Sequence, residues 1–245
     1  MKEMIKAYWD CSADGYSSFV NCGMRSRRRV FLKEILSEEI GETGKKILDV
    51  GTGPGTLALI LAEMGHDVTG LDFSEGMLSR GRENARRFGL DVAFVRGDAE
   101  DLKFEDASFD VVICRALMWT LTRPEEAVAE WNRVLRPGGI VAVIDGSWNS
   151  GKSCIKRKAW RLFSLPLIVI TERRISALGH YSRNLQKSLP LNGKERPGYD
   201  VALLQSGGFR DVRSRTIRRI GEGVLEYIKY GCYGDNFIVT GTKVE

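Results

Sequence analysis

The chain has 245 residues, 43% of them hydrophobic, which is enough to bury the core of one large α/β domain over residues 1–245. Its longest apolar run, Leu162–Thr171, is far shorter than the roughly 20 residues of a membrane-spanning helix. The charged start Met1–Tyr8 is unlike a secretory leader, and five cysteines without a CxxC pair argue against a structural zinc site. We therefore expect a cytoplasmic protein with free thiols and no metal.

The net charge of +5 is unevenly distributed along the chain. Between Gly151 and Ile220 there are 16 Lys or Arg and four acidic residues, so this segment carries +12 and the rest of the chain −7. Such a basic segment is a solvated face, a site for a phosphorylated or carboxylated small acceptor, or a contact for nucleic acid or a lipid surface. No RNA-binding motif accompanies it, which makes nucleic acid an unlikely partner.

The predicted elements alternate along the chain as βαβ units do, after an N-terminal helical cap over residues 1–40. Hydrophobic periodicity predicts helices at Thr56–Met64, Ser74–Phe88 and Pro124–Val134. The predicted strands are Lys46–Val50, Asp67–Leu71, Val92–Arg96, Phe109–Cys114, Ile140–Ile144, Asp211–Thr216 and Asn236–Thr240.

Local signals fix several of these boundaries. Ser74 is a plausible N-cap, Pro124 suits the first turn of its helix, and the "LRPGG" of Leu135–Gly139 predicts a sharp turn into the next strand. The whole pattern predicts an α/β fold: a Rossmann-like, seven-stranded, mostly parallel sheet with helices on both faces and an antiparallel last strand. Residues 45–145 form its cofactor-binding core, residues 147–200 a helical insertion capping the active site, and residues 205–245 the C-terminal strands.

A glycine-rich stretch, "ILDVGTGPGTLAL" at residues 47–59, joins the first strand to its helix. A ligand approaches this turn in open parallel sheets. Its GxGxG spacing departs from the GxGxxG of dinucleotide sites, and it lacks the GK[ST] of a P-loop. An NAD-dependent oxidoreductase is accordingly the poorer interpretation.

Four motifs in register, "ILDVGTGPG", "VTGLDFSEGML", "FVRGDAEDL" and "EWNRVLRPGG", resemble those of class I S-adenosylmethionine-dependent methyltransferases. The chain is most similar to the small-molecule, quinone-biosynthesis-like subgroup of type 11, over residues 45–145. The resemblance implies S-adenosylmethionine as donor and S-adenosylhomocysteine as product. It also implies contacts of Asp49 with the donor's ammonium, of Asp72 with the ribose hydroxyls and of Asp98 with the adenine amino group. The remaining donor contacts that it implies are Gly51, Thr52, Gly53, Gly55, Phe73, Met77, Ala99, Leu102, Cys114 and Tyr16.

The acceptor side is less defined by sequence. Arg115 can clamp an anionic group of the acceptor or pair with the cap, and His180 beside Tyr181 can orient or deprotonate an acceptor hydroxyl or amine. Trp119 can shield the methyl group or pack in the core. His66, between a helix and a strand, reads as a solvated loop histidine.

These observations predict a methyltransferase that acts on a small-molecule acceptor, anionic or partly apolar, mainly by alignment of the reacting groups. A tRNA or protein methyltransferase that docks through the basic segment is one alternative, and a non-catalytic S-adenosylmethionine-binding protein is another. The run "LFSLPLIVI" leaves peripheral lipid contact open, and the oligomeric state is not predicted.

Overall fold

The computed structural model describes residues 1–24, 27–146, 183–217 and 236–244, and within them a single seven-stranded sheet. The strand order is β3-β2-β1-β4-β5-β7-β6, in which β1 to β5 pair in parallel and β7 is antiparallel to both of its neighbours. This arrangement confirms the predicted fold class. The strands are β1 (Lys46–Val50), β2 (Asp67–Asp72), β3 (Ala93–Arg96), β4 (Phe109–Arg115), β5 (Leu135–Gly146), β6 (Phe209–Ile217) and β7 (Asn236–Lys243).

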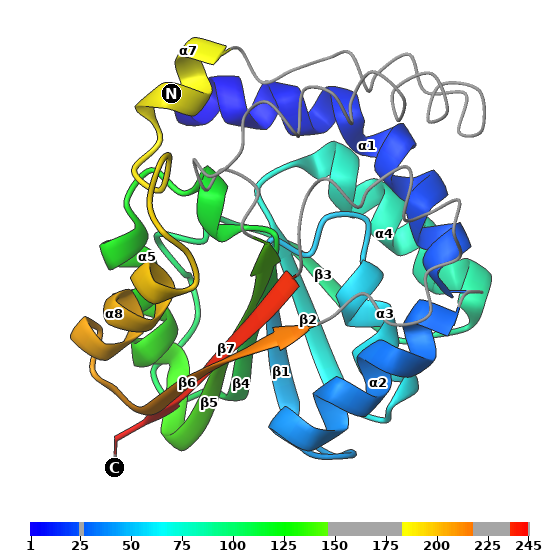
Figure 1. Ribbon diagram of the computed structural model, residues 1–245. Helices are drawn as coiled ribbons and strands as arrows, with labels where there is room; N and C mark the ends of the chain where they lie inside the picture. The colour runs from blue at the N-terminus through cyan, green and yellow to red at the C-terminus, as the bar shows by residue number, and fades with distance from the viewer. Residues whose placement is uncertain (25–26, 147–182, 218–235, 245) are drawn as a thin grey trace.

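Helices cover both faces of this sheet (Figure 1). The helices α2, α3 and α4 lie on one face, and α5 and α8 lie on the other. Each face has its own core, because successive strand side chains point to opposite sides. The helices are α1 (Lys2–Met24), α2 (Arg27–Ile40), α3 (Thr56–Glu63), α4 (Glu75–Phe88), η1 (Met118–Thr120), α5 (Pro124–Val134), α7 (Arg183–Ser188) and α8 (Gly198–Ser206).

The cap signals act as the sequence predicts. Ser74 precedes α4, and its Oγ accepts a hydrogen bond from the Met77 amide at 3.1 Å. The helix ends at Gly89, which adopts the left-handed conformation that favours glycine. Pro124 opens α5 as expected. These two helices therefore begin where the local chemistry requires.

The start of β5 differs from the prediction. We expected a turn over Leu135–Gly139, but the strand begins at Leu135, which pairs with Phe109, and Ile140 pairs with Val111. The four intervening residues bulge out of the ladder, with Gly138 at φ +74°. Pro137 and the glycines thus interrupt the strand pairing without ending the strand.

The helix α1 crosses the carboxyl ends of the parallel strands, beside α7 (Figure 1). Leu185 and Leu189 pack against Ile5 of α1. Of the expected insertion, residues 147–182 lie outside the described residues, and α8 was not predicted. Among the helices that the structure describes, none has both the length and the apolar character needed to cross a membrane.

Candidate functional site

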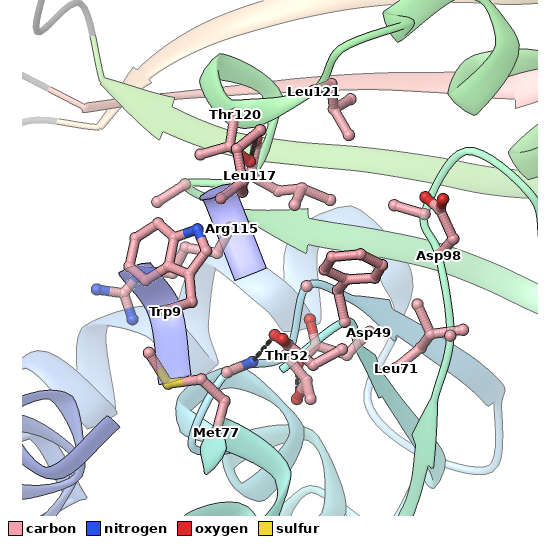
Figure 2. Close-up of a pocket in the computed structure, with 18 of the residues that line it drawn as sticks. Trp9, Asp49, Thr52, Leu71, Met77, Asp98, Arg115, Leu117, Thr120 and Leu121 are labelled. Atoms are coloured by element: carbon pink, nitrogen blue, oxygen red, sulfur yellow. Dashed lines mark hydrogen bonds between the residues drawn. The ribbon is translucent and has the colours of Figure 1, made fainter. Parts of the chain in front are cut away.

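A pocket of about 280 Å³ opens at the carboxyl ends of β1, β2 and β4, beneath α1. This volume lies near the lower end of the range of small-molecule sites, roughly 300 to 1,000 Å³. Figure 2 shows Trp9 and Met77 on one side of the pocket and Leu71 and Asp98 on the other. The location is the one that the glycine-rich stretch predicted, where open α/β sheets bind ligands.

The glycine-rich loop after β1 owes its shape to left-handed residues. Gly51 and Gly53, both in the pocket wall, have φ values of +70° and +56°. The amides of Gly51 and Thr52 both donate to the Leu71 carbonyl, at 2.8 and 3.0 Å. A β-carbon at Gly51 would lie 2.7 Å from Leu117 Cδ1. The loop therefore needs glycine both for its backbone conformation and for close approach to the pocket.

The Asp72 carboxylate ties this loop to the end of β2. Its Oδ2 accepts a hydrogen bond from the Gly53 amide at 2.8 Å, and its Oδ1 accepts one from the Ser74 amide at 2.9 Å. The Phe73 amide is a third backbone donor to this carboxylate, which lines the pocket and can also accept from a ligand hydroxyl there. Burial raises the pKa of Asp72 to about 6.

Asp49 is deeper than Asp72, with an exposed fraction of 1%. Its Oδ2 accepts hydrogen bonds from Thr52 Oγ1 at 2.6 Å and from the Ala58 amide at 3.1 Å. Burial raises the pKa of Asp49 to about 7; the nearby charge of Asp72 raises it further, and that of Arg115 lowers it. Asp49 thus places a carboxylate beside the pocket in a setting that favours a cationic ligand group.

Asp98 lies at the opposite wall, in the loop after β3. Its Oδ1 accepts a hydrogen bond from the Glu100 amide at 2.9 Å, which is typical turn chemistry. Its Oδ2 accepts a hydrogen bond from Lys2 Nζ of α1 at 2.5 Å. Ala99 also lines the pocket, and its carbonyl accepts a hydrogen bond from Trp131 Nε1. The loop is therefore both internally braced and joined to α1.

The upper part of the pocket is aromatic and apolar. Trp9 and Trp119 make an edge-to-face contact with ring centroids 6.1 Å apart, and Leu117 and Leu121 add apolar walls. Arg115, at the end of β4, extends past Trp9 and supplies a cationic group (Figure 2). This region can accept a mostly apolar molecule that bears one anionic or polar oxygen.

The structure brings most of the predicted residues together in this pocket. Its lining includes Asp49, Gly51, Thr52, Gly53, Asp72, Phe73, Met77, Asp98, Ala99 and Arg115.

Gly55, Leu102 and Cys114 lie outside the lining. A β-carbon at Gly55 would meet Phe94 at 3.1 Å, so this glycine serves helix packing. Leu102 and Cys114 are buried in the core beneath α5, and burial raises the pKa of the Cys114 thiol. All three pack within the fold in this structure, and their contact with a ligand stays a prediction.

Three predicted residues are not tested by this geometry. His180 and Tyr181 lie outside the described residues, as does the side chain of Tyr16, whose backbone belongs to α1. The interpretation of His66 as a solvated histidine is wrong, because only 6% of it is exposed and its Nδ1 accepts a hydrogen bond from the Lys45 amide. Burial, together with the charge of Lys45, lowers the pKa of His66.

The sequence interpretation missed part of the wall. Lys2, Ile5 and Glu100 line the pocket, as does Thr122 beyond η1. The bond between Lys2 and Asp98 joins residues 96 positions apart, which no local pattern indicates. Lys2 is one of three charged residues in the first six, with Glu3 and Lys6, and nothing in the sequence singles it out.

Comparison with known proteins identifies the family of this chain. Residues 48–143 match the family described as a methyltransferase domain. The chain is 36% identical over 219 residues to a demethylmenaquinone methyltransferase of Staphylococcus aureus strain JH9, covering 88% of each chain. A second demethylmenaquinone methyltransferase, of Staphylococcus haemolyticus, is 35% identical over 149 residues, which are 60% of this chain and 62% of that protein.

A solved structure shows the same fold at lower identity. Phosphoethanolamine N-methyltransferase 2 of Haemonchus contortus, in complex with phosphomonomethylethanolamine and S-adenosylhomocysteine, superposes with a TM-score of 0.61 and 17% identity. The match covers 89% of this chain and 52% of that one. This chain belongs to the class I S-adenosylmethionine-dependent methyltransferases, the family that its motifs predicted, and S-adenosylmethionine is the methyl donor of that family.

Proposed function

We propose that the protein transfers a methyl group from S-adenosylmethionine to a small, partly apolar acceptor held beside Arg115 and Trp119. The observation that carries this proposal is the placement of Asp49, Asp72 and Asp98 around one pocket at the carboxyl ends of the strands. The left-handed loop at Gly51 and Gly53 leaves room for the donor's methionine part. These residues suit a ligand with a cationic end, a ribose and an adenine.

Each donor-side role follows from hydrogen-bonding capacity. Asp72 accepts from both ribose hydroxyls, while its backbone contacts keep the carboxylate plane fixed. Asp49 neutralises the positive charge of the donor's ammonium, directly or through water. Asp98 accepts from the adenine amino group, and Phe73 and Met77 pack beside the ring. S-adenosylmethionine supplies an activated methyl group, so the protein's own residues have to align the reactants and exclude water.

The acceptor is proposed from the upper wall of the pocket. Trp9, Trp119, Leu117 and Leu121 provide apolar surface, and Arg115 provides a single cationic contact. The relatives' names specify demethylmenaquinone, and we propose an apolar quinone-type acceptor of that kind for this chain. Arg115 would stabilise the oxygen of the reduced ring as negative charge develops there.

A macromolecular acceptor is the less favoured alternative. Several cations of the basic segment are engaged within the fold: Arg196 is buried against Asp145 and Asp200, and Arg215 pairs with Glu38. Arg196 is therefore not available to a docking partner, whereas Arg215 remains partly exposed in its ion pair.

The test is a methyl-transfer assay with labelled S-adenosylmethionine and reduced demethylmenaquinone analogues of increasing chain length. We expect label in the quinone product, detected by mass spectrometry. The control is the same assay with total RNA and protein from a bacterial lysate as acceptors. Label found only in RNA or protein would overturn the proposal. Donor binding without label in any fraction would instead support the non-catalytic alternative.

A further inference from the structure

The helix α1 is fastened over the pocket at two points. Near its start, Lys2 Nζ contacts Asp98 Oδ2 at 2.5 Å and Glu100 Oε2 at 2.6 Å. Further along α1, Asp10 Oδ1 accepts hydrogen bonds from Ser74 Oγ at 2.5 Å and from the Gly76 amide at 3.3 Å. Ile5 and Trp9 face the pocket between these two points. The fastenings therefore lie at the adenine and ribose ends of the proposed donor site.

Glu100 is the centre of the first fastening. Only 3% of its side chain is exposed, and its carboxylate is surrounded by donors from other segments. Its Oε1 accepts hydrogen bonds from the amides of Thr122 at 2.6 Å and Arg123 at 3.0 Å, and the Thr122 hydroxyl and Arg123 Nε contact the carboxylate too. Although burial opposes ionisation, hydrogen bonds from Lys2, Arg123 and Thr122 hold the pKa of Glu100 at about 2. The carboxylate is thus charged and fixed.

Three walls of the pocket meet at this carboxylate. Lys2 belongs to α1, which covers the pocket. Glu100 follows Asp98 and Ala99 in the segment that we assign to the adenine, and Thr122 follows the segment of Trp119 that we assign to the acceptor. None of these segments is adjacent to another in sequence. A charge buried at their junction makes the position of each depend on the other two.

The two carboxylates that contact Lys2 differ in their expected relation to bound S-adenosylmethionine. Asp98 is the residue expected to accept from the adenine amino group, so the donor and Lys2 share one carboxylate. Glu100 has no expected contact with the donor and its other partners are protein groups. It can therefore keep Lys2, and with it α1, in place while the donor occupies Asp98.

We propose that Glu100 is a positioning residue that acts through Lys2 to hold α1 closed over the bound donor. This inference rests on the proposed function, because it assigns the pocket to S-adenosylmethionine. Donor and product leave when the contact between Lys2 and Glu100 opens. Loss of this contact speeds dissociation and raises KM for the donor, whereas the methyl-transfer step itself is little changed.

The experiment measures dissociation of S-adenosylhomocysteine from the full chain by stopped-flow tryptophan fluorescence, with Trp9 and Trp119 in the pocket wall as reporters. We expect Lys2→Met and Glu100→Gln each to raise the dissociation rate about tenfold, as loss of a charge-assisted contact does. The double variant should be no faster than Lys2→Met alone, because Lys2→Met already removes the contact that Glu100→Gln weakens. Lys2→Arg, which keeps the charge, should restore a rate near that of the wild type.

Asp101→Asn is the matched control, since Asp101 neighbours Glu100 in the same loop but contacts the exposed Lys103. Its dissociation rate should equal that of the wild type. If Glu100→Gln fails to fold, Lys2→Met and Lys2→Arg still test whether the contacts of Lys2 hold α1 closed. A wild-type rate in Lys2→Met, or multiplicative effects in the double variant, would overturn the role of Glu100. Failure of the wild type to bind S-adenosylhomocysteine would instead overturn the proposed function.

Discussion

Asp72 holds the glycine-rich loop and faces the pocket, so its substitution tests the donor site directly. Asp72→Asn keeps the size but replaces one acceptor oxygen with a donor. We expect donor affinity to fall by about 10- to 100-fold, because hydrogen bonds to a charged group contribute about 1.5 to 3 kcal/mol and 1.4 kcal/mol is tenfold. Titration calorimetry with S-adenosylhomocysteine measures the effect. Asp67→Asn, exposed at the other end of β2, is the control, and equal affinities in the two variants would refute the ribose assignment.

The two raised carboxyl pKa values predict how donor affinity depends on pH. In the free protein, burial keeps the pKa of Asp49 at about 7 and that of Asp72 at about 6. Asp10 and Asp49 face Asp72, and Arg115 faces Asp49. Below these values the carboxyls are neutral, and a cationic donor favours their ionised forms. Affinity for S-adenosylmethionine should therefore rise by about an order of magnitude between pH 5.5 and pH 7.5. Calorimetry in matched buffers measures this change. A flat profile would contradict it.

At the scale of elements, a buried ionic triad joins α8 to the sheet. The Arg196 guanidinium contacts Asp200 Oδ2 at 2.8 Å and Asp145 Oδ2 at 2.9 Å, and all three side chains are at most 6% exposed. Its guanidinium also lies 5.2 Å from the centre of the Phe237 ring of β7. The triad thus connects β5, β7 and α8.

We expect Arg196→Met to lower the free energy of unfolding by about 3 to 5 kcal/mol, because two buried carboxylates lose their shared cation. The loss should be smaller at pH 5 than at pH 8, since Asp145, whose pKa burial raises to about 6, can become neutral. Urea denaturation followed by circular dichroism measures both values. Lys103→Met is the control, because its pair with Asp101 is exposed and exposed ion pairs contribute little to stability. Equal losses in the two variants would show that the triad is not specially stabilising.

Local pattern predicted most elements of the core but not their contacts. β1 and α5 have the predicted bounds, because an apolar strand and a proline-started helix are encoded by adjacent residues. Asp49 and Asp72, at the ends of β1 and β2, line the pocket, whereas Cys114, near the end of β4, packs in the core. The side to which a strand residue points depends on sheet pairing and bulges, which the sequence does not display.

The part of the pocket formed by α1 was the least predictable from the sequence. Trp9 and Lys2 belong to the predicted N-terminal cap, in which only Tyr16 was assigned to the donor site. Their positions in the pocket wall depend on a helix that crosses the carboxyl ends of the strands. Such contacts arise from tertiary packing, not from periodicity. The α8 helix was missed because its apolar residues do not form a clear stripe along one side.

For the whole molecule, donor binding should raise thermal stability. A ligand at 100 times its Kd stabilises the folded state by about 2.7 kcal/mol, and each kcal/mol shifts Tm by roughly 2 to 4 °C in a chain of this size. We therefore expect S-adenosylmethionine and S-adenosylhomocysteine to raise Tm by about 5 to 10 °C in a thermal-shift experiment. NAD at the same concentration is the control. Stabilisation by NAD alone would be incompatible with the donor site described above.

The strand order also governs how the protein can be made. β7 lies between β5 and β6, although it follows both in the chain, so β5 keeps a free edge until residue 243 has been synthesised. A polypeptide still attached to the ribosome therefore presents an unpaired, apolar edge in the middle of its future sheet. Completion of the sheet has to wait for translation of β7, and during that interval the open edge of β5 can pair with another chain.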